Sequence, residues 1–462
     1  MSAMNRVFAV AFASSLGLAC GSDATTASGG AGDTGAATDS SGAAAECVEA
    51  SECPDDRPYC SEGMCLPCPQ LESCAVHDPA TPVCHEPSGR CLPCLPDDNA
   101  CPSDTPLCTG AGQCVQCLES TDCPDSACNR FTGACMPTDA VYWVFNDDDH
   151  EWPDPDGTDT APFGSIEEVL ATVDDEEVTI WLAGDVRFEA NGMTIEGPRT
   201  IAVREFVDPI FGDDDAVPLF AGGPPAMTLT SGARVILEEV SVYEAEDVGI
   251  DCFGASLWLV DSGIAHGNGV GLRAVDCDVH LLRTHLGGND GGAITTSGGS
   301  HLSIVNSVIG LNGTALDDET TTLDLRGGTA DITYSTIAAN YGAPGHASLR
   351  CSDTDVRIHD SIVTSFDPSI DCPGARVDHS VIDTASLSGD GVHVADFNPH
   401  WFESFYVARE RIYHPTLADP DTTPLAGVAR WTLGDPLTDI DGDRRPAVDG
   451  SSDYVGCERP AP

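Results

Sequence analysis

Serine or threonine residues recur at intervals of 19 to 28 residues in the second half of the chain, and similar local sequences surround them. On the N-terminal side of each one, apolar residues alternate with polar residues, as in Leu257/Leu259 and Val356/Ile358. Alternation with a period of two predicts β-strands with one buried face, and no helical periodicity competes with it. The recurring turn residues are Ser262, Thr284, Ser307, Ser335, Ser361 and Ser380.

One such unit has too few apolar residues to bury its strip alone, so the pattern predicts that the units stack as successive coils. We therefore predict an all-β fold with a right-handed parallel β-helix over residues 138–400 and a closing segment over residues 401–462. A helix over residues 165–173 is expected to cap the first coil. Ser165 and Glu168 form a capping-box pair there, and Ile166, Val169 and Leu170 share one helical face.

Asparagines follow the turn residues by five or six positions, at Asn268, Asn289, Asn312 and Asn340. Such a column predicts side chains that hydrogen-bond from coil to coil, although turn chemistry alone would also favour asparagine there. The column, together with residues 156–166 and 178–184, resembles right-handed β-helix proteins of the pectate-lyase-like superfamily. Residues 438–446 and 453–458 resemble the closing segment of bacterial surface β-helix proteins, with Cys457 where alanine is usual. The resemblance implies a fold and leaves the activity open.

Sixteen of the 22 cysteines lie in residues 46–137, in four units of four. A segment with so few large apolar residues predicts a disulfide framework with two bridges in each unit, and three pairings stay open. Zinc held by the CxxC pairs between units is the alternative. The spacing resembles Dickkopf-type cysteine-rich regions and the short cysteine-rich repeats of Gram-negative surface proteins, which implies a stalk or a protein-contact module. The units are Cys47, Cys53, Cys60 and Cys65; Cys68, Cys74, Cys84 and Cys91; Cys94, Cys101, Cys108 and Cys114; and Cys117, Cys123, Cys128 and Cys135.

Five more cysteines fall within the predicted coils and the closing segment. Cys351 and Cys372 occupy the same place in successive coils, so the spacing of parallel strands would allow a bridge. Cys252 and Cys277 are one coil apart but offset by three positions, which makes their pairing harder to predict. Cys457 is left over, and its role is open.

Residues 1–19 are typical of a signal peptide, with Arg6 followed by an apolar run too short to span a bilayer. Gly17-Leu18-Ala19-Cys20 resembles the lipobox of bacterial lipoproteins, with Gly17 where leucine is preferred. This resemblance implies a lipidated Cys20 and a location at the outer membrane or cell surface; cleavage without lipid would make the chain extracellular. Residues 20–45 are small and polar and predict a flexible tether.

The chain carries a formal net charge of −55, from 75 acidic and 20 basic residues, and every basic residue is arginine. Such a surface repels nucleic acid and anionic lipid through their phosphates. Contact with a membrane is therefore expected through a lipid anchor only. The expected partner is a carbohydrate or a surface protein.

Outward polar residues on adjacent predicted coils supply one candidate catalytic patch. Asp331, Arg357 and Arg376 are expected in one column, and His359 and Asp378 in the next. Tyr334, Asp360 and His379 are expected at the edge of the turn. An arginine or histidine in such a patch could abstract a proton from an acidic sugar, but outward positions on a solenoid are also polar by default.

No cofactor is required by any motif, and calcium is the one ion that the sequence suggests. Asp439, Asp441 and Asp443 form an oxygen-rich turn that lacks the twelfth-position glutamate of an EF-hand. Residues 146–149 form a similar acidic turn, and residues 213–215 are most simply a loop.

Three functions follow from these expectations. The first is a non-enzymatic surface lipoprotein whose β-helix binds a carbohydrate or a protein. The second is a polysaccharide lyase or glycoside hydrolase acting on an acidic glycan. The third makes the cysteine module the binding element and the β-helix a spacer.

Overall fold

The computed structural model describes residues 47–48, 52–53, 57–61, 64–71, 73–97, 100–145, 154–183, 187–189, 192–206, 219–221, 223–313, 320–341, 347–365, 370–402 and 424–459. The predicted signal peptide, Cys20 and the tether lie outside the described residues, as do the acidic segments 146–149 and 213–215.

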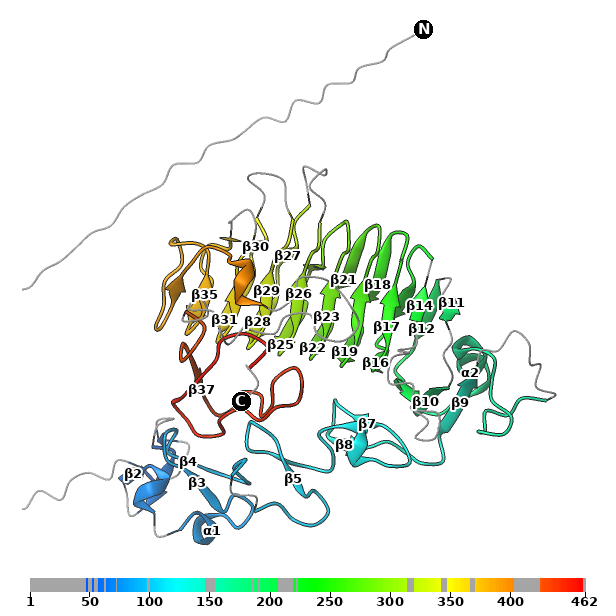
Figure 1. Cartoon of the computed structure of the whole chain (residues 1–462). Helices are drawn as coiled ribbons and strands as arrows, with labels where there is room; N and C mark the ends of the chain where they lie inside the picture. Colours follow the sequence, from blue (N-terminus) through cyan, green and yellow to red (C-terminus); the bar gives the residue numbers. More distant parts are fainter. Residues whose placement is uncertain are drawn as a thin grey trace, which may run out of the picture.

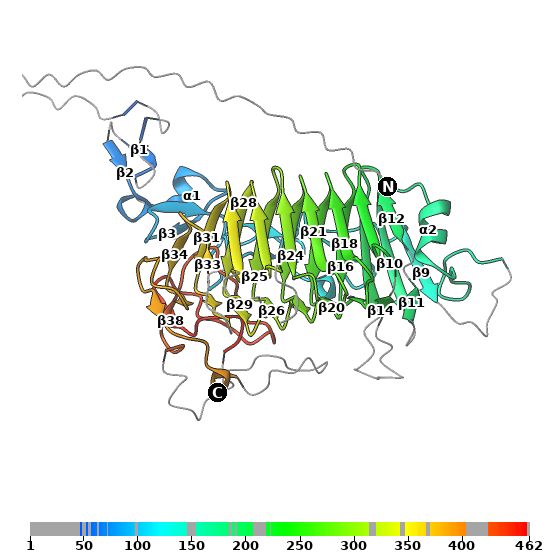
Figure 2. The same cartoon turned by 90° about the horizontal axis from the view of Figure 1, so that it is seen from above.

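Three parallel sheets form the body of the molecule, and consecutive strands of the chain pass from one sheet to the next (Figure 1). Each sheet therefore gains one strand per coil, which is the topology of a parallel β-helix, here right-handed. Seen from above, the strands of successive coils run side by side (Figure 2).

Sheet 1 contains β9 (Val141–Phe145), β10 (Glu177–Ala183), β13 (Thr200–Phe206), β16 (Arg234–Glu238), β19 (Ser256–Val260), β22 (Asp278–Leu282), β25 (His301–Val305), β28 (Thr329–Thr333), β31 (Asp355–His359) and β34 (Arg376–Asp378). Sheet 2 contains β11 (Arg187–Glu189), β14 (Leu219–Ala221), β17 (Ser241–Tyr243), β20 (Gly263–Ala265), β23 (His285–Gly287), β26 (Val308–Gly310), β29 (Thr336–Ala338), β32 (Ile362–Val363), β35 (Val381–Ile382) and β36 (His393–Val394). Sheet 3 contains β12 (Met193–Glu196), β15 (Met227–Thr230), β18 (Val248–Phe253), β21 (Val270–Val275), β24 (Ile294–Ser297), β27 (Leu323–Arg326), β30 (Leu349–Ser352) and β33 (Ile370–Asp371).

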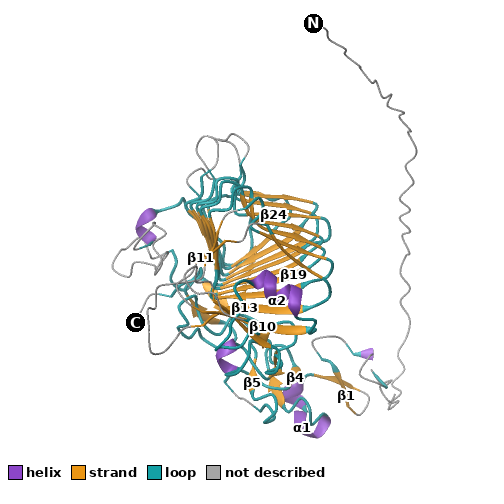
Figure 3. Ribbon diagram, turned by 90° about the vertical axis from the view of Figure 1, so that its right-hand side faces the viewer, coloured by secondary structure: helices purple, strands orange, loops and turns teal. Residues whose placement is uncertain are grey.

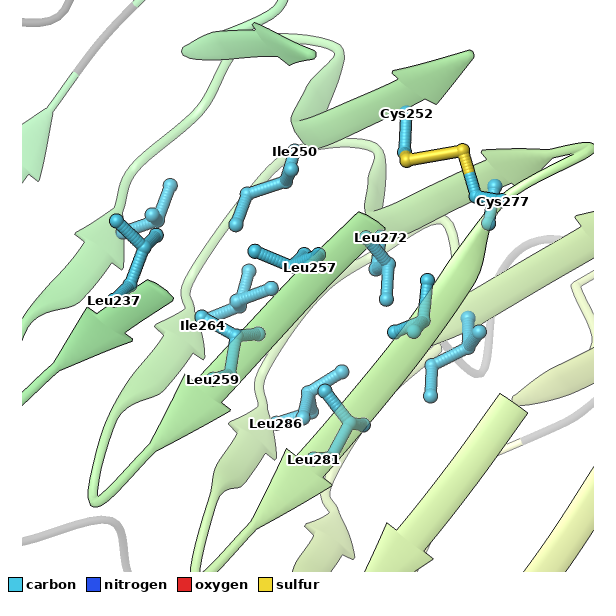
Figure 4. Packing of buried hydrophobic residues seen from close by; sticks show 14 of the residues in the cluster. Leu237, Ile250, Cys252, Leu257, Leu259, Ile264, Leu272, Cys277, Leu281 and Leu286 are labelled. Carbon is cyan, nitrogen blue, oxygen red and sulfur yellow. A yellow bond between two sulfur atoms is a disulfide. The ribbon is translucent and has the colours of Figure 1, made fainter. Parts of the chain in front are cut away.

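The core lies between the three sheets and runs the length of the solenoid. Leu257 and Leu259 point inward from β19 and lie in register with Val279 and Leu281 of the next coil (Figure 4). All four side chains are buried, as the alternating pattern predicts. Aliphatic side chains thus stack on their counterparts one coil away, and the apolar strip is continuous.

In six described turns from sheet 1 to sheet 2, from Asp261–Ser262 to His379–Ser380, a residue in the left-handed region precedes a buried serine or threonine, whereas Val240 follows Glu239 in the turn before them. The left-handed residues have φ between 45° and 56°, and Tyr334, Asp360 and His379 are among them. In the coils from Thr284 to Ser380, the hydroxyl of the next coil's turn serine accepts a backbone N–H, as Ser307 Oγ does from Thr284 N at 3.1 Å. This ladder explains why the sequence repeats the residue at one place per coil.

The asparagine ladder is present, but it is one residue shorter than the sequence predicted. Asn289 Nδ2 donates to Asn312 Oδ1 at 2.9 Å, and Asn312 Nδ2 donates to Asn340 Oδ1 at 3.2 Å. Asn268 is exposed, and Gly267 lies at the ladder position, where its N–H donates to Asn289 Oδ1. The buried members follow their turn residue by five positions, whereas Asn268 follows by six. A single extra residue moves the side chain out of the stack.

The predicted capping helix is α2 (Ile166–Thr172), which lies across the first coil (Figure 3). Its side chains Ile166 and Val169 join the solenoid core. Ser165 Oγ accepts from Glu168 N, as in a capping box, but Glu168 Oε2 accepts from Gly164 N rather than from Ser165 N. The helix therefore covers apolar edges that would otherwise face water.

The cysteine module consists of small antiparallel hairpins and single helical turns. These are β1 (Tyr59–Ser61), β2 (Met64–Leu66), β3 (Val83–His85), β4 (Arg90–Leu92), β5 (Leu107–Cys108), β6 (Cys114–Val115), β7 (Cys128–Asn129), β8 (Ala134–Cys135), α1 (Cys74–His77), η2 (Cys68–Gln70) and η3 (Ser120–Asp122). In each unit the first cysteine bonds to the third and the second to the fourth, as in Cys117–Cys128 and Cys123–Cys135. All sixteen sulfurs are thereby used, which contradicts the zinc alternative.

The module packs along the flank of the β-helix and does not project from it as a stalk (Figure 1). Its fourth unit lies on the first strands of sheet 1, where Ala127 and Met136 pack on Ala202 and Ile236. Ser120 Oγ donates to Glu238, and Asn129 Nδ2 donates to Glu177 at 2.8 Å. Burying these outward apolar residues explains why a docked position is favoured over an extended one.

The closing segment, residues 424–459, adds no coil to the solenoid. It carries the antiparallel pair β37 (Ala429–Trp431) and β38 (Ser451–Asp453), and a helical turn, η4 (Pro399–Trp401), precedes it. The segment lies between the module and the last coils (Figure 1). Gly434 N donates to Gly110 O in the module, and Arg430 N donates to Asp360 Oδ1 in the coils.

Both cysteine pairs in the coils form disulfides, Cys252–Cys277 and Cys351–Cys372. Cys457 forms none; it is buried, its Sγ lies 3.3 Å from Thr336 Oγ1, and burial raises the pKa of its thiol to about 12. It is therefore an inert part of the packing. Of the described helices, none has the length and apolar character that a membrane crossing needs.

Candidate functional site

Sheet 1 presents two columns of side chains on its outward face, and all of them except Trp258 are polar. Residues that lie in register on consecutive strands form each column. The first column is Ser256, Asp278, His301, Thr329 and Asp355. The second column is Trp258, His280, Ser303, Asp331, Arg357 and Arg376.

The structure places the predicted residues Asp331, Arg357 and Arg376 in one column, as expected. Arg376, however, forms its ion pair with Asp355 of the first column and not with Asp331. Both guanidinium groups are exposed. Arg376 Nη2 lies 2.9 Å from each carboxylate oxygen of Asp355 in the first column. This diagonal pair is itself exposed, so solvent screens it and its contribution to stability is small.

The turn-edge part of the predicted patch is covered. Tyr334 is fully buried, and the guanidinium carbon of Arg445 lies 4.0 Å from the centre of its ring. Asp360 is 2% exposed and accepts from Arg430 N at 2.8 Å. The closing segment thus removes these two residues from any open site, because it folds back over the turns between sheets 1 and 2.

His359 is enclosed by the same segment. Its Nε2 lies 2.6 Å from Thr333 Oγ1, and its Nδ1 lies 3.2 Å from Asp360 Oδ2 and 3.7 Å from Asp435 Oδ1. Burial raises the pKa of Asp435 to about 6, and the neighbouring His359 opposes that rise. The cluster links the closing segment to the coils and is not directed at solvent.

Asp378 and His379 are half-buried at the last strand of sheet 1. Asp378 lies in register with His359, and His379 Nε2 lies 3.7 Å from Asp390 Oδ2. The predicted patch is therefore divided between an exposed arginine strip and a covered turn. The sequence could not reveal this, since nothing periodic marks residues 424–459.

A second cluster, missed from the sequence, lies in the middle of the same face. Asp278, His280 and His301 each offer a ligand atom, and these atoms lie within 4.8 Å of one another. The His280 ring stacks on Trp258 with centroids 4.3 Å apart and an interplanar angle of 13°. Burial lowers the pKa of His280, while Asp278 opposes that shift. The register of outward residues on adjacent strands was the signal that could have identified the cluster.

The open part of the face is bounded at both ends. The fourth cysteine unit covers β10, β13 and β16, and Glu119 reaches Arg283 at 3.1 Å. The closing segment covers the turns from Asn306 onward, where Asn306 Nδ2 donates to Thr438 O. Between them, outward residues from Asp278 to Arg376 remain accessible.

The predicted calcium turn has a structural role in the fold. Asp439 is fully buried, and its Oδ1 accepts from Asp441 N at 3.1 Å and from Asp443 N at 2.8 Å. Its Oδ2 accepts from Arg459 N at 3.1 Å. This carboxylate holds the turn together, and calcium binding there stays a prediction.

Comparison with known proteins gives one family match, over part of the chain, and structural similarities at low sequence identity. Residues 33–141 match a family described as a family of unknown function (DUF8331), which covers the cysteine module. No curated protein matches the sequence. Among solved structures, the chain is similar to the pectate lyase Pel9A, with a TM-score of 0.36 and 11% identity over 70% of this chain and 96% of that one. It is also similar to a rhamnogalacturonan lyase, with a TM-score of 0.29 and 9% identity over 58% and 91% of the two chains.

Proposed function

We propose that this protein is an exported, lipid-anchored surface protein that binds a carbohydrate along the outward face of sheet 1. The observation that carries the proposal is the accessible strip from Asp278 to Arg376, flanked by the cysteine module and the closing segment. Its polar groups repeat at the strand spacing of about 4.8 Å. A repeating polymer can meet such a strip with several equivalent groups at once.

The chemistry of the strip suits an acidic or neutral glycan. Arg357 and Arg376 offer planar donors that match carboxylates, and His301 and Asp331 add further polar groups. The disulfides of the module support an oxidising location outside the cytoplasm. Lipidation of Cys20 belongs to this proposal and is tested by mass spectrometry of the mature N-terminus.

Binding is tested by applying the intact protein to an array of uronate-containing and neutral glycans. Arg357→Ala is expected to weaken binding to the recognised glycan at least tenfold. Arg326→Ala is the matched control, because Arg326 is a half-exposed arginine on the outward face of sheet 3. Equal binding by parent and Arg357→Ala would contradict the proposal. Loss on Val76→Asp, an exposed residue of the module, would instead assign binding to the module.

A polysaccharide lyase is the second candidate, and the exposure of Arg357 favours it. On this face Arg357 could hold the carboxylate of an acidic sugar, and the carboxylate of Asp331 beside it could act as the base that takes the sugar proton. The same glycans are therefore incubated with the protein, with and without calcium, while the absorbance of unsaturated product is followed. Turnover that Arg357→Ala abolishes would establish the lyase. Binding without turnover supports the non-enzymatic function.

A further inference from the structure

Three chelating side chains meet on the outward face of sheet 1, on two adjacent strands. Asp278 and His280 are alternate residues of β22, so both point outward, and His301 follows on β25 in register with Asp278. His280 Nε2 lies 3.1 Å from Asp278 Oδ1, and the rings of His280 and His301 meet edge to face at 5.6 Å. Strand pairing fixes these positions, because each Cα is held by a ladder of backbone hydrogen bonds.

Neighbouring residues orient both imidazoles. His301 Nδ1 lies 2.8 Å from Thr329 Oγ1 on the next coil, which leaves Nε2 as the ring nitrogen that can bind an ion. Metal-binding histidines commonly use their other nitrogen in this way. The flat stack of His280 on Trp258 restricts the rotation of that ring. Such support is what distinguishes a prepared site from a chance meeting of exposed side chains.

We propose that Asp278, His280 and His301 form a site for a divalent transition-metal ion of the zinc class, with further coordination positions open to solvent. Two imidazole nitrogens and one carboxylate suit Zn²⁺, whereas Ca²⁺ prefers oxygen ligands alone. Tetrahedral Zn²⁺ with bonds of about 2.0–2.1 Å holds its ligand atoms roughly 3.4 Å apart. The ligand atoms of the three residues now lie within 4.8 Å of one another, so movements of about 1 Å by each side chain would bring them to that separation.

The open positions face the accessible strip. The Asp278 side chain is 47% exposed and that of His280 is 20% exposed, so water can complete the coordination shell. If the face binds an acidic glycan, an inference that rests on the function proposed above, a sugar carboxylate could replace one of these waters. The ion would then attract an anionic ligand to a protein whose net charge is −55.

The test is zinc binding to the tag-free, disulfide-intact protein by isothermal titration calorimetry, without glycan and with excess Mg²⁺ to occupy weak carboxylate sites. One equivalent of Zn²⁺ is expected to bind. His280→Gln and His301→Gln should each weaken that binding at least tenfold. His393→Gln should leave it unchanged, since His393 is an exposed histidine on sheet 2.

A second readout uses Co²⁺ in place of Zn²⁺, because its visible absorption reports nitrogen and oxygen ligands in a tetrahedral site. The absorption is expected with the parent and with His393→Gln, and it should be lost with His301→Gln. Absence of a saturable zinc site, or zinc affinity unchanged in both His280→Gln and His301→Gln, would overturn the proposal. Because no glycan is present, that failure would leave the proposed carbohydrate binding to be judged by its own array.

Discussion

Asn312 shows how one buried side chain can serve three coils. Its Nδ2 donates to Leu286 O at 2.9 Å and to Asn340 Oδ1 at 3.2 Å, and its Oδ1 accepts from Asn289 Nδ2 at 2.9 Å. Removing the amide would leave each of these buried groups short of a partner. The Asn312 amide therefore contributes more to the stability of the turns between sheets 2 and 3 than a single hydrogen bond would.

We expect Asn312→Ala to lower the free energy of unfolding by about 2–4 kcal/mol, measured by urea titration with the disulfides intact. Asn268→Ala is the matched control, because Asn268 is exposed and outside the ladder. Its change should stay within about 0.5 kcal/mol. Equal losses from the two substitutions would contradict a role for buried coil-to-coil amide bonds.

Asp383 gives the fold a pH dependence that can be measured. Burial raises its pKa to about 6, although Ser365 N donates to its Oδ2 at 2.9 Å, and Oδ1 is buried without a hydrogen-bond partner. An acid whose pKa is raised on folding destabilises the fold where it is ionised. The cost is absent below the unfolded pKa of about 4 and complete above about 6.

The Asp383→Asn variant cannot ionise at this position and so escapes that cost. The gain in unfolding free energy over the parent should therefore be larger at pH 8 than at pH 4 by about 1–2 kcal/mol, a figure reduced for the partial exposure of the side chain. Urea titrations of both proteins at the two pH values give this difference. A difference of the opposite sign would show that the carboxylate is stabilised by its surroundings.

The closing segment is attached to the coils by apolar packing and by a group of buried polar contacts around Arg445. Arg445 and Asp453 are an ion pair with both side chains fully buried, and Arg445 Nη2 also donates to Asn306 Oδ1 and to Gly456 O. Removing one member of a buried pair costs about 3–5 kcal/mol. Here Arg459, whose Nε lies 2.9 Å from Asp453 Oδ1, would offset part of that cost. Both members of the pair lie in the closing segment, and Arg445 reaches the coils through Asn306 and the ring of Tyr334.

Arg445→Ala should therefore release the segment while the β-helix stays folded. Hydrogen exchange is expected to rise across residues 424–459 and to stay slow in β19, β22 and β25. Arg444→Ala, at the exposed neighbouring residue, should leave both regions unchanged. Protection of the segment retained in Arg445→Ala would show that its other contacts suffice.

The elements that could be predicted from the sequence are those with a local pattern, and the contacts that could not are those between distant segments. The coils, the turn ladder and α2 could be predicted because their patterns are local, as in Leu257/Leu259 and Ser165/Glu168. Contacts such as Asn306 with Thr438 join residues far apart in the chain, and no local pattern marks them. Tyr334 and Asp360 were thus expected at an open edge, although the segment buries both.

Neither the pairing of the cysteines nor the proximity of Asp278, His280 and His301 could be predicted from the residue pattern without the strand register. Four cysteines per unit leave three pairings. In each unit the hairpin aligns the third cysteine with the fourth, as with Cys128 and Cys135, and these two bond to the first and the second, Cys117 and Cys123. Asp278 and His301 are separated by one coil, so only the strand alignment reveals that they are neighbours. Residue identity alone gives no such information.

For the whole molecule, three parts share one flank. The module, the closing segment and the outward face of sheet 1 meet there, joined by His85 Nε2 to Asp449 Oδ2 at 2.9 Å as well as by the contacts of the fourth unit. Ion pairs between coils occur on this face, as between Arg376 and Asp355, and on sheet 3, as between Arg350 and Asp324 at 3.1 Å, but the described contacts of the module and the closing segment gather at the flank of sheet 1. Function is therefore expected on the flank where the parts converge.

Everything proposed for that flank depends on parallel coils in the register described above. A direct measurement is the distance between spin labels carried by unnatural amino acids at positions 256 and 355, which begin β19 and β31 in the same column. Four strand spacings separate the two positions, so their Cα atoms should lie about 19 Å apart with a narrow distribution. A broad distribution, or a Cα separation above about 30 Å, would contradict the stacking of coils.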